Sequence, residues 1–124
     1  NRLIAALIGK DETALMKTLR TIATTGDRAT LQAAAKRIGS LAVYCDQQWF
    51  ARVLDAWRSE VDFKPCWFQI AWQAVLADAD DRAVQAAEAA AVRYPEERLF
   101  VEECAYLKEV VAQRAEQRWL DEIP

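Results

Sequence analysis

Three pairs of adjacent carboxylates are the first residues of this 124-residue chain that could carry chemistry. The pairs are Asp80 with Asp81, Glu96 with Glu97, and Glu102 with Glu103. Acid–base catalysis and metal binding need carboxylates that converge, whereas adjacent residues on a helix point in different directions. Acidic residues near a helix start are also favoured by the helix dipole. We therefore expect these pairs to have a structural role.

Two features that many enzymes use, histidine and a glycine-rich phosphate loop, are missing from the sequence. It contains no histidine, which removes the commonest general base and the commonest zinc ligand. Its three glycines, Gly9, Gly26 and Gly39, lie far apart, so no glycine-rich phosphate loop is present. The sequence therefore predicts a protein that is not an enzyme, with no catalytic residue, no cofactor and no metal site.

The three cysteines have no spacing that indicates a site. Cys45, Cys66 and Cys104 are 21 and 38 residues apart, which fits neither a pair of metal ligands nor a disulfide framework. Each lies among apolar neighbours, where a free cysteine packs as a small hydrophobic residue. We expect buried thiols. The alternative, one reactive thiol, predicts fast labelling of the native protein at a single position.

The charge balance also limits the classes of partner. Sixteen basic and nineteen acidic residues give a net charge of -3, and both signs are spread along the chain. This pattern does not suggest a broad nucleic-acid surface. The apolar run within residues 1–8 is too short to cross a bilayer and lacks the layout of a secretory signal, which predicts a cytoplasmic protein without a membrane segment. Because the first residue is Asn1, we expect a trimmed chain or a piece of a longer one.

Apolar residues recur at steps of three and four along most of the sequence, which predicts helices. The predicted helices span residues 11–24, 27–42, 46–61, 65–77, 82–93 and 96–120, and the N-terminal segment brings the total to seven. Asp11, Asp27 and Asp46 are predicted N-caps, because their side chains can accept hydrogen bonds from free amide groups. Pro65 suits the first turn of the next helix.

The predicted helix starts repeat with a constant period. Asp11, Asp46 and Asp80 are 35 and 34 residues apart, and the same separations join Asp27, Asp62 and Glu96. Two interleaved series with one period indicate a repeated pair of helices. The pairs span about residues 1–26, 27–61 and 62–95, followed by a final helix at 96–120, all within one domain of residues 1–124.

The third pair resembles the tetratricopeptide repeat, a helix-turn-helix unit of about 34 residues. The positions that match its signature are Trp67, Ile70, Ala71, Ala83, Ala90 and Pro95. Ala74 and Ala87 depart from it, because aromatic residues are expected there. The earlier pairs match in period and in helix starts but not in signature, and in the second either Ala34 with Ala35 or Ile38 with Gly39 fits the aliphatic-small step. The resemblance implies an all-α fold of about three and a half antiparallel pairs, with seven helices stacked as a short right-handed solenoid.

Eight of the twelve aromatic residues lie between residues 44 and 72. They are Tyr44, Trp49, Phe50, Trp57, Phe63, Trp67, Phe68 and Trp72. One interpretation is that they fill the interface between alanine-rich helix pairs. The other follows from the tetratricopeptide resemblance, which implies that the first helix of each pair lines a concave face. Phe68, Trp72 and Val75 would then lie in a groove that binds an apolar partner segment.

The leading hypothesis is a protein-protein interaction module. We expect it to bind a helical or extended segment of another protein, such as an amphipathic helix, as a bacterial chaperone or adaptor. In size and architecture it resembles the small tetratricopeptide-type chaperones of type III secretion. The alternatives are a self-association domain that forms a homodimer through exposed aromatic residues, and a repeat segment of a larger scaffold or regulator.

Overall fold

The protein is entirely helical. The computed structural model describes residues 1–124 and contains seven α-helices, two short 3-10 helices and no strand. The α-helices are α1 (Arg2–Ile8), α2 (Glu12–Thr25), α3 (Arg28–Ser40), α4 (Gln47–Glu60), α5 (Trp67–Leu76), α6 (Asp80–Arg93) and α7 (Arg98–Asp121), with 3-10 helices η1 (Ala42–Tyr44) and η2 (Lys64–Cys66). The predictions of an all-α fold and of seven helices are confirmed.

Three of the predicted helix starts are N-caps. The side chains of Asp11, Asp27 and Asp46 accept hydrogen bonds from backbone amides three residues on, at 3.0, 2.9 and 2.7 Å. Hydrogen bonds with Thr30 lower the pKa of Asp27. The bond from Lys10 and the amide of Trp49 lower the pKa of Asp46. The pKa shifts of Asp27 and Asp46 therefore favour the charged form that caps the helix.

Of the other three predicted starts, Asp80 is correct, because it is the first residue of α6, whereas no helix begins at Asp62 or Glu96. Asp62 lies in a turn with φ of 46° and pairs with Arg93, while α5 begins after the η2 turn that contains Pro65. Helix α6 begins at Asp80, as the period predicts and two residues before the predicted range of 82–93, and its N-cap residue, Ala79, has no capping side chain. The residue before α7 is Glu97 rather than Glu96, and Glu97 pairs with Lys64 instead of capping. Local spacing could not show these longer-range ion pairs.

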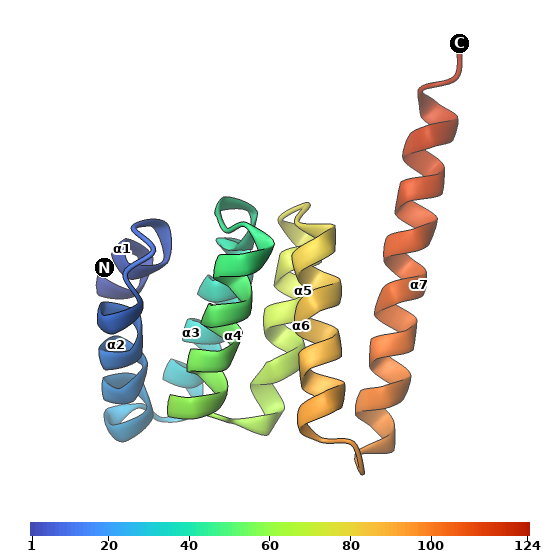
Figure 1. Ribbon diagram of the computed structural model, residues 1–124. Coiled ribbons are helices and arrows are strands. Elements are labelled where there is room, and N and C mark those ends of the chain that lie inside the picture. Colours follow the sequence, from blue (N-terminus) through green and yellow to red (C-terminus); the bar gives the residue numbers. More distant parts are fainter.

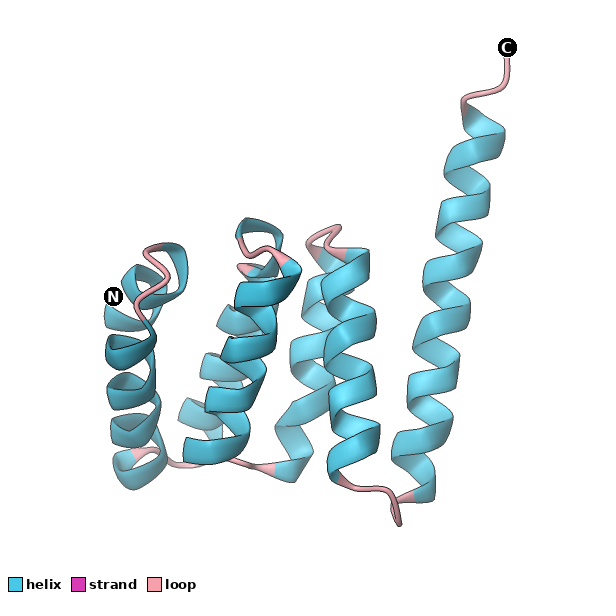
Figure 2. Ribbon diagram, in the orientation of Figure 1, coloured by secondary structure: helices cyan, strands magenta, loops and turns pink.

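The first six helices form two layers (Figures 1 and 2). Helices α1, α3 and α5 lie side by side in one layer, and α2, α4 and α6 lie in the other; α7 stands at the end of the stack, against α6. The most extensive packing joins α3 to α5 within a layer and α5 to α6 between layers. With 24 residues, α7 is the longest helix, and its C-terminal end projects beyond the stack.

Two of the turns between the layers have the same backbone hydrogen bonds, 68 residues apart. Between α1 and α2, the amide of Asp11 donates to the carbonyl of Ala6; between α5 and α6, the amide of Ala79 donates to that of Ala74. Lys10 and Asp78, the residues before these two donors, both have positive φ, 53° and 61°. Between α3 and α4 the η1 turn takes a different path. The separation of 68 residues is twice the period of 34 that the helix starts indicate.

The core contains thirty buried hydrophobic residues and no buried charged residue. Five of the eight clustered aromatic residues are buried: Trp49, Phe50, Trp57, Trp67 and Phe68. Phe63 and Trp72 are partly buried, whereas Tyr44 is exposed. A small residue lets α3 and α5 approach closely within their layer, since a Cβ at Gly39 would lie too close to the backbone of Ile70 on α5. The packing interpretation therefore holds for most of the aromatic cluster.

Candidate partner-binding groove

Helix α7 is held against α5 and α6 by one apolar face. Phe100, Cys104, Leu107 and Val111 recur at steps of four and three, which places them on one side of the helix. Leu107 is fully buried and Cys104 nearly so. This face anchors α7 at the end of the stack.

The three aromatic pairs of the structure all involve α7. Phe68 on α5 meets Phe100 edge to face, with ring centroids 5.0 Å apart. Tyr94, in the turn before α7, meets Phe100 in the same manner at 5.4 Å. Further along, the Trp72 ring lies 5.7 Å from that of Tyr106. Such pairs contribute about 0.5–1.5 kcal/mol each beyond the area that they bury. Aromatic side chains therefore form much of the junction between α5 and α7.

A groove of about 450 Å³ runs between α5 and the first half of α7. Its lining residues are Lys64, Pro65, Phe68, Gln69, Trp72, Gln73, Leu99, Phe100 and Glu103. Phe68, 7% exposed, lies deep in the groove, and Trp72 is half-buried. Leu99, next to Phe100 on α7, is 74% exposed. The groove thus combines a deep aromatic residue with an exposed aliphatic one.

The structure brings two of the three predicted groove residues together and separates the third. Phe68 and Trp72 line the groove, but Val75 does not. Val75 is buried beneath α7, and its carbonyl accepts a hydrogen bond of 2.7 Å from Arg114. The sequence prediction is corrected at Val75, because it treated α5 as one face of an open array and did not include α7 as its cover.

Several groove residues were missed because they come from a second helix. Leu99, Phe100 and Glu103 lie about thirty residues beyond α5 in the sequence. The apolar periodicity of α7 showed that one face would be buried, but not against which helix. The pairing of aromatic residues at 68, 72, 100 and 106 was the available signal, since aromatic side chains tend to pair across helix contacts.

The charged side chains around the groove form ion pairs or hydrogen bonds, and one of them, Glu103, is partly buried. Lys64 pairs with Glu97 at one end. Nearby, Arg93 and the hydroxyl of Tyr94 donate to Asp62; burial raises the pKa of Asp62, but these hydrogen bonds outweigh it and lower the pKa overall. Inside the groove, burial raises the pKa of Glu103, and hydrogen bonding with Trp72 only partly opposes that shift. The groove therefore offers an apolar surface with one carboxyl group that is poorly solvated.

Comparison of the chain with protein-family models, curated proteins and solved structures returns no significant match in any of the three. The functional argument therefore rests on the geometry of the chain. None of its helices has both the length and the apolar character that a membrane crossing needs.

Among the residues that could carry chemistry, only Glu103 lines the groove. No group of three cysteine, aspartate or glutamate side chains could hold a metal ion. Cys45, Cys66 and Cys104 are buried, as predicted, and burial raises the pKa of each thiol. From the three carboxylate pairs, Asp80 contacts Arg114 and Arg118, Glu97 contacts Lys64, and Glu102 contacts Arg98.

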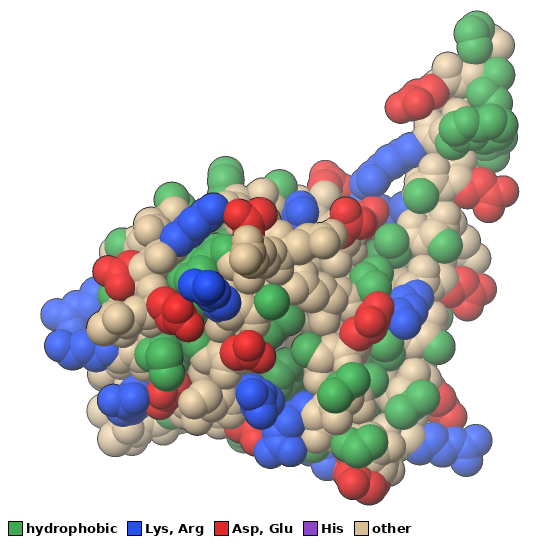
Figure 3. Space-filling view, viewed as in Figure 1, with side chains coloured by type: hydrophobic (Ala, Val, Ile, Leu, Met, Phe, Trp, Pro, Cys, Tyr) green, Lys and Arg blue, Asp and Glu red, His purple; other side chains and the backbone are tan.

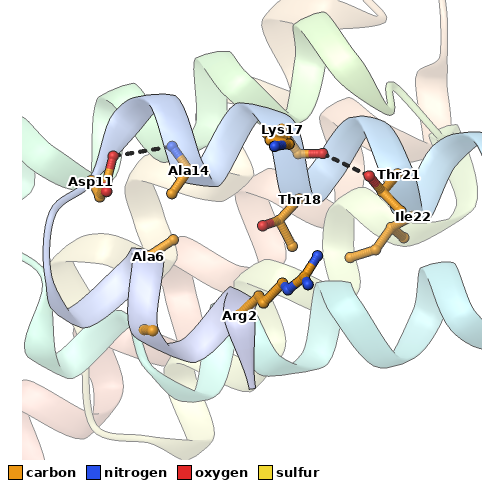
Figure 4. A pocket seen from close by; sticks show the side chains of 9 residues that line it. Arg2, Ala6, Asp11, Ala14, Lys17, Thr18, Thr21 and Ile22 are labelled. Atoms are coloured by element: carbon orange, nitrogen blue, oxygen red, sulfur yellow. Dashed lines mark hydrogen bonds between the residues drawn. The ribbon is translucent and has the colours of Figure 1, made fainter.

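A second pocket lies at the opposite end of the stack, between α1 and α2 (Figure 4). Its volume is about 440 Å³, and small side chains such as Ala5, Ala14 and Thr18 line it. Arg2 and Lys17 border it, and neither belongs to any ion pair in the structure. Two cations and the Asp11 carboxylate line this pocket, whereas aromatic side chains line the groove between α5 and α7.

Proposed function

We propose that the protein is a protein-protein interaction module whose groove between α5 and α7 binds an apolar segment of another protein. The observation that carries this proposal is the grouping of Trp72, Leu99 and Tyr106 around the groove. Leu99 and Tyr106 are 74% and 60% exposed, and Trp72 is half-buried. Large apolar side chains grouped at a concave site are typical anchors of protein interfaces.

The proposal includes a tetratricopeptide-like architecture, with the helix pairs stacked as a short right-handed solenoid. Three features support it: the period of about 34 residues in the sequence, the two helix layers, and the equivalent turns at Lys10 and Asp78. In such arrays the first helices of successive pairs line a continuous binding surface. In that arrangement α5 and α7 are first helices of adjacent pairs, so the groove lies on that surface.

The lining of the groove favours an amphipathic helix or an extended peptide as its occupant. Phe68 and Phe100 offer an apolar surface to aliphatic side chains. The amides of Gln69 and Gln73 can bond polar groups of a peptide at the rim. Lys64, the one cation in the lining, is already paired with Glu97. Capture of an acidic peptide terminus is therefore disfavoured, and a chaperone or adaptor for an amphipathic segment fits better.

Peptide display provides the test. Random helical peptides are selected on the wild-type protein and then measured against Trp72→Gln/Leu99→Gln, which removes two apolar groups from the groove. Val92→Gln is the matched control, since Val92 on α6 is exposed and outside the groove. We expect selected peptides with apolar positions three and four apart, whose binding weakens at least about tenfold in the groove variant and not in the control. Equal binding to all three proteins, each folded, would refute the proposed site.

A further inference from the structure

The two ends of the stack carry opposite charge. Residues 1–40 contain seven lysine and arginine residues against three aspartate and glutamate residues, a net charge of +4. Residues 96–124 contain four against eight, a net charge of -4. In Figure 3 basic side chains gather at the α1–α2 end, and hydrophobic ones at the projecting end of α7. The molecule is therefore polarised along the direction in which its helices stack.

The outer face of α7 combines an acidic row with an apolar stripe. Glu102, Glu109 and Glu116 are seven residues apart, which places them on one side of the helix. The apolar stripe beside them consists of Val101, Ala105, Ala112, Ala115 and Trp119, at helical spacing and all exposed. Trp119 is 63% exposed, and Leu120 next to it is also exposed. This face is distinct from the one that packs on α6 and from the side that borders the groove.

The α1–α2 end has the complementary features. Its pocket is lined mostly by small side chains that leave room for a large one, and its charged lining residues are Arg2, Lys17 and the N-cap residue Asp11, so cations are in excess. In Figure 4 the Arg2 side chain extends from α1 toward Thr18 and Ile22 on α2. Because these two cations have no acidic partner within the chain, they are available to carboxylates from another molecule. A bulky apolar residue flanked by glutamates fits this site in both shape and charge.

We propose that copies of this chain associate head to tail, with the outer face of α7 of one copy on the α1–α2 end of the next. Trp119 enters the pocket beside Ala14 and Thr18, and the glutamate row faces Arg2 and Lys17. The two contacting surfaces are different, so the contact is heterologous and can repeat. A symmetric pair of α7 helices would instead bring two acidic rows together. Head-to-tail contact leaves the groove between α5 and α7 free.

Sedimentation velocity on the intact chain at low salt tests this arrangement. We expect a concentration-dependent series of dimers and larger species that dissociate in high salt, because exposed charges are screened there. Trp119→Ala should weaken association at least about tenfold. Val43→Ala is the control, since Val43 is an exposed apolar residue outside both surfaces. A wild-type protein that stays monomeric at its highest soluble concentration, or that stops at a dimer, would overturn the proposal.

Charge reversal gives a second and independent test. Arg2→Glu/Lys17→Glu alters only the α1–α2 end, and Glu109→Lys/Glu116→Lys alters only the outer face of α7. All four residues are exposed, so both variants should keep the helical content of the wild type. Each variant alone should be monomeric, because its two contact surfaces then carry charge of the same sign. An equimolar mixture should regain association, because the acidic surfaces of one variant can then meet the basic surfaces of the other. A mixture that stays monomeric, or single variants that associate as the wild type does, would contradict the head-to-tail contact. Peptide binding to the groove is not involved in either result.

Discussion

At the scale of single residues, the environment of Glu103 destabilises the folded state at neutral pH. Burial in the groove raises its pKa above the ordinary value of 4.5. An acid with a raised pKa holds its proton more tightly when the protein is folded than when it is unfolded. The folded state is thus disfavoured once the pH rises above the ordinary value, and this loss is complete above the raised value. A side chain of the same shape as glutamate but without its charge would remove this loss of stability.

Replacing Glu103 by glutamine should therefore stabilise the protein at pH 7. We expect the Tm to rise by a few degrees at neutral pH and to be unchanged well below pH 4.5, where the carboxyl is protonated in both states. Thermal unfolding followed by circular dichroism across this pH range measures both. Glu109→Gln, on the exposed outer face of α7, serves as the control. A Tm that falls at pH 7 would show that the carboxylate of Glu103 stabilises the fold.

The second prediction at the residue scale concerns the stability effect of a side chain at Gly39. Its side of α3 lies so close to α5 that a Cβ would overlap Ile70 O and Gln73 Cβ. Because two backbones meet there, the added methyl group cannot be relieved by a rotamer change alone. We expect Gly39→Ala to lower the free energy of unfolding by about 1–3 kcal/mol in urea denaturation. Ser40→Ala, at the neighbouring exposed position, should change it much less.

At the scale of elements, the sequence predicts what is local and misses what depends on a distant helix. Asp11, Asp27 and Asp46 are correct N-caps because a cap needs only the three residues that follow it. Asp62 and Glu97 are engaged instead by Arg93 and Lys64, about thirty residues away. Such partners come from the stacking of helices, which periodicity within one helix does not determine.

The groove shows the same division. The tetratricopeptide resemblance implied Phe68 and Trp72 as groove residues, and both line the groove. It could not identify Leu99 or Glu103, because the register between α5 and α7 is fixed by contacts such as Phe68 with Phe100. For the same reason it could not show that α7 covers Val75.

The prediction at the scale of elements concerns the stability with which α7 packs on the stack. Leu107 is fully buried between α7 and the stack, so truncating it leaves a cavity at the only apolar face that holds this helix. We expect Leu107→Ala to cost about 2–5 kcal/mol and to speed amide hydrogen exchange in α7 more than in α3. Val101→Ala, on the exposed outer face, is the matched control. Equal acceleration in both helices would show that α7 does not open separately from the rest.

At the scale of the whole molecule, two surfaces with different character lie on different parts of the stack. The groove between α5 and α7 is apolar and aromatic, whereas the ends of the stack are polarised in charge. We assign the groove to a foreign segment and the ends to further copies of the chain. An array of copies would then present the groove repeatedly, so that a partner with several binding segments would be held more tightly than one with a single segment.

The most direct test of the proposed function is to locate a bound peptide by nuclear magnetic resonance. The protein is labelled with 15N and titrated with the tightest peptide from the display selection. The five tryptophan indoles report on separate places, because Trp49, Trp57 and Trp67 are buried, Trp119 is exposed on α7, and Trp72 lines the groove. We predict that the largest shifts fall on the Trp72 indole and on the amides of Gln73 and Leu99. Shifts that leave these three unchanged and fall on α2 or α4 would contradict the assignment of the groove.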